Sequence, residues 1–281
     1  MKRLFLSLFI FIGGCSAVKD LKVAQSLTDK NVAGKPARIQ VTIPENGDRV
    51  YSVDAGVGYT HTVSVNLEKN RQTDLTFGGE YHRNTATDKP KDSTIVALRL
   101  DQIRGDIAEH DDPIVFPGIG INFKKDRVKG TESIVPSVDI TWRSIRFRIG
   151  DVIGRDGPVG FEWQPTFGTE IEFVNKADAN NPTGRIGRAW GSLDANLYPA
   201  WGAIRSRLQL AGTLRLWQDY AKSSRIDTGR DRHYLRKLSL NYFFDEENRF
   251  GIGVDRVSGE NPSEGEPEQR YTQVSFKVHL K

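Results

Sequence analysis

The residues from Val159 to Phe173 read VGFEWQPTFGTEIEF, and this stretch decides the fold. Its odd positions are apolar or aromatic except at Thr169, whereas its even positions carry only glycine and polar residues. Successive side chains of a β-strand point to opposite faces, so the stretch predicts one strand with an oily face and a polar face. At about 3.3 Å per residue it spans roughly 45–50 Å, far more than the usual strand of a soluble sandwich. A tilted strand that crosses a membrane fits this length.

The same alternation continues on both sides of this stretch, from Pro36 to the end of the chain, for example over 51–67, 186–198 and 204–218. We therefore predict about twelve strands. The expected short turns are 68–71, 153–158, 199–203 and 245–248, and the expected longer polar loops are 85–92, 124–132, 175–185, 221–230 and 259–269. The run after Trp142 changes phase at Arg143 and Ser144, which predicts a β-bulge. Pro165 lacks a backbone N–H, so we expect a second bulge in the longest strand.

Composition fits this prediction. A chain of 281 residues can form one large all-β domain. Hydrophobic residues make up 37% and charged residues 27%, which suits a barrel because only alternate residues face lipid. No window approaches the ~18 apolar residues of a transmembrane helix, which excludes a helical membrane protein. The net charge of +4 comes from mixed charges without a recognition motif, so we expect no nucleic-acid partner.

The N-terminus reads MKRLFLSLFIFIGGC and indicates export. Lys2 and Arg3 precede a short apolar run, so residues 1–14 are expected to be a signal peptide. Cys15, the single cysteine, follows Gly13 and Gly14 in a pattern that resembles the lipobox of bacterial lipoproteins, which implies lipidation at Cys15. The alternative is a plain signal peptide cut after Ala17. Residues 15–35 are polar and are expected to form a periplasmic tether or a plug.

Over residues 36–281 the chain resembles Gram-negative bacterial outer-membrane β-barrel proteins as a class, especially the small twelve-strand channel type. The resemblance rests on the long strands of alternating hydrophobicity and on the alternation of short and longer connections between them. It does not rest on a single motif. It implies an all-β fold with a single closed antiparallel up-and-down transmembrane β-barrel. It also implies a place in the bacterial outer membrane with the N-terminus in the periplasm. The partners it implies are outer-membrane lipid, small polar solutes and the barrel assembly machinery.

Tryptophan and tyrosine gather near the ends of the predicted strands, as in the aromatic girdles of membrane proteins. The residues concerned are Trp142, Trp163, Trp190, Trp201, Trp217, Tyr198, Tyr220 and Tyr242.

The expected function is passive diffusion of small hydrophilic solutes, with a lean toward anionic ones. Opposed rows of charge orient polar solutes in a channel, and arginine matches the planar geometry of carboxylates and phosphates. The expected pore-lining residues are Arg146, Arg148, Arg205, Arg207, Arg215, Lys237, Glu162, Glu170, Glu172 and Asp194.

Three alternatives remain open. Long charged side chains could pair across the lumen and close it, which would give a structural or assembly lipoprotein of the envelope. An outer-membrane hydrolase is the second, but the five histidines have neither a catalytic serine partner nor metal-ligand spacing, so we expect no metal and no cofactor. The third is a soluble β-sandwich that presses its apolar faces together.

Overall fold

The structure is a computed structural model that describes residues 21–24, 37–44, 50–66, 68–84, 90–105, 114–144, 149–150, 153, 158–176, 183–199, 207–224, 226, 230–245, 248–262 and 266–278. The named elements in these residues are all β-strands. No helix within them has the length and hydropathy to cross a membrane.

Thirteen strands make up the described part. They are β1 (Leu21–Ala24), β2 (Ala37–Pro44), β3 (Val50–Asn66), β4 (Arg71–Asn84), β5 (Asp92–Arg104), β6 (Ile114–Asp126), β7 (Thr131–Arg143), β8 (Gly160–Lys176), β9 (Gly184–Tyr198), β10 (Leu208–Lys222), β11 (Arg232–Phe243), β12 (Phe250–Asn261) and β13 (Glu266–Val278).

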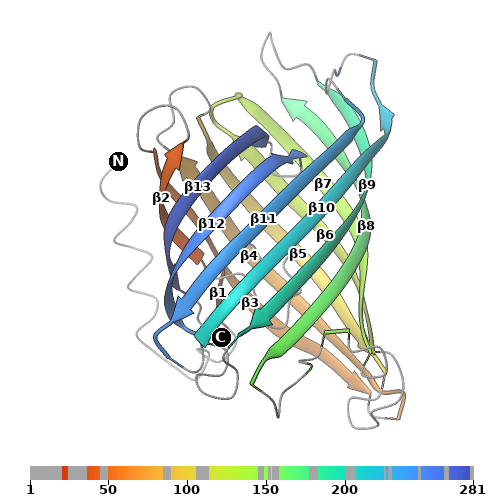
Figure 1. Cartoon of the computed structure of the whole chain (residues 1–281). Helices are drawn as coiled ribbons and strands as arrows, with labels where there is room; N and C mark the ends of the chain where they lie inside the picture. Colours follow the sequence, from red (N-terminus) through yellow and green to blue (C-terminus); the bar gives the residue numbers. More distant parts are fainter. Residues whose placement is uncertain are drawn as a thin grey trace, which may run out of the picture.

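The strands form one antiparallel up-and-down sheet, which confirms the predicted all-β class. From β4 to β13 each strand pairs with the next one along the chain. β13 also pairs with β2, where Val274 lies opposite Val41, and β3 pairs with both β2 and β4. β1, from the predicted tether, pairs with residues 56–59 of β3, beyond the part of β3 that pairs with β2. Figure 1 shows the long tilted strands curving round, with β10–β12 in front and β4 and β5 behind.

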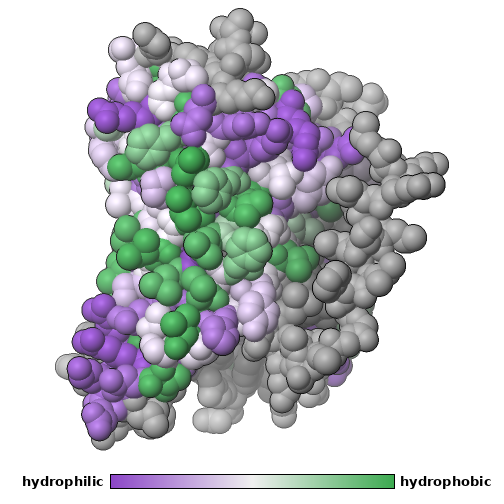
Figure 2. Space-filling view, turned by 180° about the vertical axis from the view of Figure 1, so that it is seen from behind, coloured by the Kyte–Doolittle hydropathy of each residue, from purple (hydrophilic) through white to green (hydrophobic). Residues whose placement is uncertain are grey.

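The two faces of the sheet differ as the alternation predicts. In β12, Phe250, Ile252 and Val254 are 42%, 49% and 45% exposed, whereas Asp255 on the opposite face is fully buried. Figure 2 shows such hydrophobic residues gathered in a band across the middle, with hydrophilic ones above and below. A sandwich would bury these apolar side chains, so the soluble alternative is wrong.

Several predicted connections are wrong. β6 and β7 pair up to Asp126 and Thr131, so the predicted loop 124–132 is only the turn 127–130. The predicted loop 259–269 likewise shrinks to 262–265, and the predicted short turn 153–158 is part of a long connection over 144–159. The strand predicted over 204–218 is displaced to Leu208–Lys222. Short and long connections therefore do not alternate along the chain, contrary to the prediction.

The two predicted bulges are wrong as well. Ser144 and Ile149 exchange backbone hydrogen bonds of 2.9 and 2.8 Å in an antiparallel bridge, so the two residues do not belong to one bulged strand. The pairing of β8 with β7 ends at Thr166, so the preceding residue, Pro165, lies just outside that ladder. On its other side Pro165 pairs with Leu193 of β9 without a register shift. The missing N–H of Pro165 therefore interrupts no ladder. Two residues before Pro165, the Trp163 carbonyl accepts a hydrogen bond of 2.7 Å from the backbone N–H of Gly150.

The aromatic prediction holds only for some residues. Tyr220 and Tyr242 are 55% and 43% exposed on the apolar face, as a girdle requires. Trp217 and Tyr198 are each only 3% exposed and share the polar face. Trp190, directly opposite Trp217 in the register, shares that face too. Three of the predicted girdle residues therefore line the other side of the sheet, and Trp201 lies outside the described residues.

Candidate functional site

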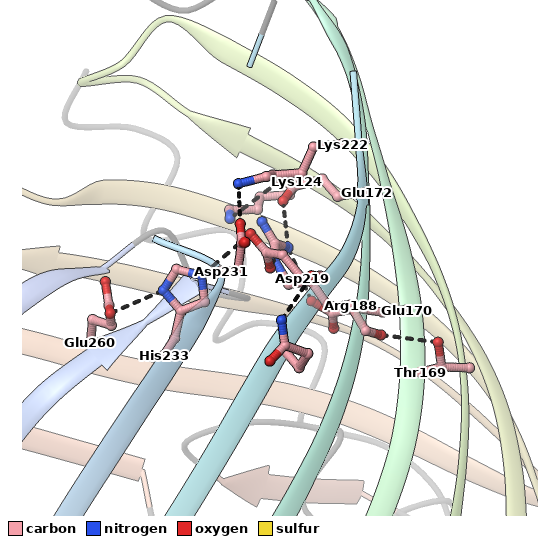
Figure 3. A network of polar contacts seen from close by, with 11 residues as sticks. Lys124, Thr169, Glu170, Glu172, Arg188, Asp219, Lys222, Asp231, His233 and Glu260 are labelled. Atoms are coloured by element: carbon pink, nitrogen blue, oxygen red, sulfur yellow. Dashed lines mark hydrogen bonds and ion pairs between the residues drawn. The ribbon is translucent and has the colours of Figure 1, made fainter. Parts of the chain in front are cut away.

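The polar face of the sheet is the candidate site, and we call it the inner wall because its side chains point to the inside of the curved sheet (Figure 3). Its charged side chains are largely cut off from water. Arg99, Arg188 and Lys277 are 4%, 3% and 3% exposed. Charged side chains are almost never this buried unless they are paired. The pairing of these charges therefore determines what the inner wall can do.

Arg188 on β9 holds three carboxylates from the two neighbouring strands (Figure 3). Its Nη1 lies 3.1 Å from Oε1 of Glu170 and 2.9 Å from Oε2 of Glu172, both on β8. Its Nε lies 3.4 Å from Oδ1 of Asp219 on β10. The register causes this meeting, because Glu170 and Asp219 lie directly opposite Arg188 on either side. A planar guanidinium with five N–H donors suits such a shared position better than lysine would.

The network around Arg188 extends in both directions. Toward β6, Lys124 Nζ lies 3.7 Å from Oε1 of Glu172, to which Ser133 of β7 donates at 2.8 Å. Toward β12, the ring of His233 lies between two carboxylates, with Nε2 3.3 Å from Asp219 and Nδ1 3.0 Å from Glu260. We call this set the Arg188 cluster: Lys124, Ser133, Glu170, Glu172, Arg188, Asp219, His233 and Glu260. It links the strands from β6 to β12 near one end of the inner wall.

One exposed ion pair lies beside this cluster. Lys222 Nζ, at the end of β10, lies 2.5 Å from Oδ1 of Asp231, just before β11 (Figure 3). The hydrogen bond and the positive charge of Lys222 lower the pKa of the Asp231 carboxyl.

A second buried histidine has similar surroundings. His82 on β4 is fully buried, with Nδ1 3.0 Å from Asp54 of β3 and Nε2 3.2 Å from Glu80. Ser93 lies directly opposite His82 in the register, but both ring nitrogens already face carboxylates. Neither nitrogen is therefore placed to take a proton from the serine. This group is not among the sites predicted from the sequence, although two residues spaced i and i+2 on a strand, as Glu80 and His82 are, share a face.

Arg99 on β5 reaches across β6 to a carboxylate on β7. Its Nη2 lies 2.8 Å from Oδ2 of Asp139 on β7 and 2.9 Å from Oδ1 of Asp101. The intervening strand β6 carries Gly120 at the crossing point, where an added Cβ would lie 3.1 Å from Ser137 and 3.7 Å from Arg99. Because Gly120 has no side chain, the Arg99 guanidinium can cross β6 to reach Asp139.

A chain of hydrogen bonds crosses the wall from β8 to β13, and we call it the polar belt: Glu162, Tyr198, Gln209, Asn241, Lys277 and Asp255. The Tyr198 hydroxyl donates to Oε1 of Glu162 at 2.8 Å and accepts from Gln209 Nε2 at 3.4 Å. Asn241 Nδ2 donates to Oε1 of Gln209 at 2.8 Å. The belt therefore links Glu162 to the far strands through neutral groups.

The other end of the polar belt is ionic. Lys277 Nζ donates to Oδ1 of Asn241 and lies 3.2 Å from Oδ1 of Asp255. Lys237 approaches Oδ2 of the same carboxylate at 3.3 Å, and Gln273 donates to it at 3.0 Å. Asp255 is fully buried, which its two cations make tolerable.

Arg215 has aromatic neighbours on the inner wall. Its guanidinium carbon lies 5.7 Å from the ring centroids of both Trp190 and Trp217. Both distances suit a cation–π interaction. Arg215 is partly exposed, so this cation remains in contact with water.

The structure places six predicted pore-lining residues on the inner wall: Glu162, Glu170, Glu172, Asp194, Arg215 and Lys237. Arg207 directly precedes β10 and is partly exposed. Arg146, Arg148, Arg205 and the predicted lipidation site Cys15 lie outside the described residues. Glu170 and Glu172 meet at Arg188, which is not among the predicted lining residues. Asp194 instead accepts a hydrogen bond from Thr213 at 2.6 Å.

The inner wall offers fixed charges and hydrogen-bonding groups. Within the described residues, no group of three or more histidine, cysteine, aspartate or glutamate side chains is arranged to hold a metal ion. These groups can orient water and guide polar solutes along the wall.

The chain matches no family model and no curated protein. Solved structures similar to it include the NanC porin, with a TM-score of 0.45 and 11% identity over 87% of this chain and 100% of that one. OmpT, an outer membrane protein of Vibrio cholerae, has a TM-score of 0.40 and 11% identity over 92% of this chain and 96% of its own. The outer membrane channel DcaP of Acinetobacter baumannii has a TM-score of 0.36 and 12% identity over 93% and 81%.

Proposed function

We propose that the sheet closes into a twelve-strand transmembrane β-barrel, β2 to β13, in the bacterial outer membrane. The pairings of β2 with β13 and of β3 with β4 support closure, because each of these strands then has a partner on both sides. Closure matters in lipid, where an unpaired edge would leave backbone polar groups without partners. The band of exposed apolar side chains supports the membrane location, since contiguous apolar surface of this kind needs an apolar neighbour.

We propose that this barrel is a channel for the passive diffusion of small hydrophilic solutes. The observation that carries the proposal is the direction of the ion pairs. The ion pairs named above lie within one strand or join strands that are adjacent or separated by one strand, as Arg99 joins Asp139 and Lys124 joins Glu172, so they run along the wall. Charges that closed the lumen would reach across it instead. The partial exposure of Glu162, Arg215 and Lys237 supports a water-filled interior.

A single-channel recording tests this function. The full chain, refolded in detergent and added to a planar bilayer, should give stepwise, ohmic conductance in KCl. A bilayer that stays silent, with folded barrels shown to be inserted in it, would overturn the channel.

The burial of charge favours a second candidate, a closed structural or assembly barrel of the envelope. Asp255 is fully buried and Lys277 and Arg188 are 3% exposed, as expected of a salt-bridged interior. This candidate requires inserted protein without conductance, so the same recording separates the two.

The remaining assignments are proposals of the same kind. We propose an exported chain with a signal peptide over 1–14, an acylated Cys15 and a barrel that the assembly machinery inserts from the periplasm. We propose no enzymatic activity, because both buried histidine rings have each nitrogen facing a carboxylate.

A further inference from the structure

The cations of the inner wall are not equally able to act on a passing ion. Arg188 is shared by three carboxylates and Arg99 by two, and both guanidinium groups are nearly fully buried. Lys277 and Lys237 both lie against Asp255. A cation held against carboxylates at about 3 Å presents little net positive charge to the lumen, because the field of the pair falls off faster than that of a single charge.

Glu162 differs from the carboxylates in these pairs. Its Oε1 accepts hydrogen bonds from Asn196 Nδ2 at 2.6 Å and from the Tyr198 hydroxyl at 2.8 Å, and both donors are neutral. Among the described residues no bond is found to its Oε2, and its side chain is partly exposed. Hydrogen bonds from neutral groups hold a carboxylate in place without cancelling its charge.

The neighbours of Glu162 fix it firmly. Tyr198 is itself held by Gln209, which accepts from Asn241, so the carboxylate stands at the end of the polar belt. A rigidly held, uncompensated charge in contact with lumen water attracts ions of opposite sign and repels those of the same sign.

We propose that this channel conducts cations in preference to anions, and that Glu162 is the residue that sets this preference. The proposal rests on the channel function given above and names the class of solute, small cations and cationic polar molecules. It reverses the preference for anionic solutes that is expected from the sequence. That expectation depends partly on Arg146, Arg148 and Arg205, which lie outside the described residues. Arg215 opposes Glu162, because its positive charge lies over two indole rings and is partly exposed.

The test is the zero-current voltage of the full chain in a planar bilayer under a KCl gradient. The unchanged protein should give a zero-current voltage with the sign of the potassium equilibrium potential, which indicates a preference for potassium over chloride. E162Q should lower the potassium-to-chloride permeability ratio by up to about fivefold, the size of the interaction of two unit charges ~4 Å apart in water. R215Q should change the ratio in the opposite direction.

The matched control is E68Q, the same substitution in the exposed turn 68–70 off the inner wall, which should leave the ratio unchanged. Circular dichroism in detergent confirms that each variant keeps its strand content. Chloride preference of the unchanged channel, or equal ratios for E162Q and the unchanged protein, would overturn this proposal while leaving the channel in place. Absence of conductance would overturn the channel function and this proposal with it.

Discussion

At the scale of single residues, Arg188 supplies the positive charge that pairs with three buried carboxylates. Replacing it by glutamine leaves Glu170, Glu172 and Asp219 with much less positive charge in a site that water barely reaches. Removing one partner of a buried ion pair costs about 3–5 kcal/mol, because the remaining charge stays desolvated. We therefore expect R188Q to lower the free energy of unfolding by that amount, measured by urea unfolding in detergent micelles.

The matched control for R188Q is R127Q. Arg127 pairs with Asp92 at 2.8 Å, but its side chain is 48% exposed. Exposed pairs contribute about 0–1 kcal/mol, so this variant should unfold nearly as the unchanged protein does. Similar losses of unfolding free energy in R127Q and R188Q would contradict the role of burial.

A second residue-scale prediction concerns pH in the connection between β11 and β12, outside the strands. Arg249 Nε lies 2.8 Å from Oδ2 of Asp245, and this hydrogen bond, with the backbone N–H groups of Arg249 and Phe250, lowers the pKa of the Asp245 carboxyl. A depressed folded-state pKa means that the contribution to stability is present above the ordinary pKa of 3.8 and is lost as pH falls through the lower folded value.

The variant R249Q removes the largest cause of this shift. We expect the titration midpoint of the Asp245 carboxyl, followed by NMR with labelled aspartate, to rise toward its ordinary value in R249Q. The backbone hydrogen bonds remain, so the return should be partial. A midpoint that does not move would show that Arg249 does not hold this carboxyl.

At the scale of the strand, neighbouring residues should tolerate the same substitution very differently. Leu214 of β10 is 37% exposed on the apolar face, whereas Thr213 next to it faces the inner wall and donates to Asp194 at 2.6 Å. Arginine facing lipid near the bilayer midplane costs ~2–4 kcal/mol. We therefore expect L214R to lower the unfolding free energy in lipid vesicles by about that much.

Arginine at position 213 would instead enter the lumen beside a carboxylate. T213R should therefore fold with a much smaller loss than L214R and should raise the chloride permeability of the channel. Equal losses from both substitutions would mean that the two faces of β10 do not meet different surroundings.

Strand faces could be read from the sequence, but strand ends and the register between strands could not. Alternation places Glu162 and Glu170 on one face because the period of a strand is fixed by its backbone. Near the strand ends the outer face also becomes polar, so Lys124 and Asp126 resemble loop residues although they are buried on the inner wall. This loss of contrast explains why the sequence predicts a long loop where the structure has only the turn 127–130.

The candidate site was only partly predictable for a related reason. Lys124 meets Glu172 across β7, and Arg99 meets Asp139 across β6, because of the register of three strands at once. A one-residue slip would reverse every face, and the sequence alone does not fix the slip between strands. The pairs within one strand, such as Glu80 with His82, are the ones that spacing could have found.

At the scale of the whole molecule, the decisive contact is the one between the first and last long strands. Val41 of β2 lies opposite Val274 of β13 in the register. Directly opposite residues of an antiparallel pair point to the same face and lie close enough for a disulfide, whereas the next residue points to the other face. Cys15 is the single cysteine, so a C15S background allows one engineered bridge at a time.

We expect V41C/V274C in this background to form a disulfide within one chain when the folded protein is oxidised in detergent. The bridge joins distant parts of the chain, so the unfolded, non-reduced protein should migrate faster in a denaturing gel, and reductant should abolish the difference. V41C/S275C, shifted by one residue, should not form the bridge. If neither pair forms a bridge, or if both form it equally, β2 and β13 do not meet in this register, and the closed barrel on which the channel depends would have to be abandoned.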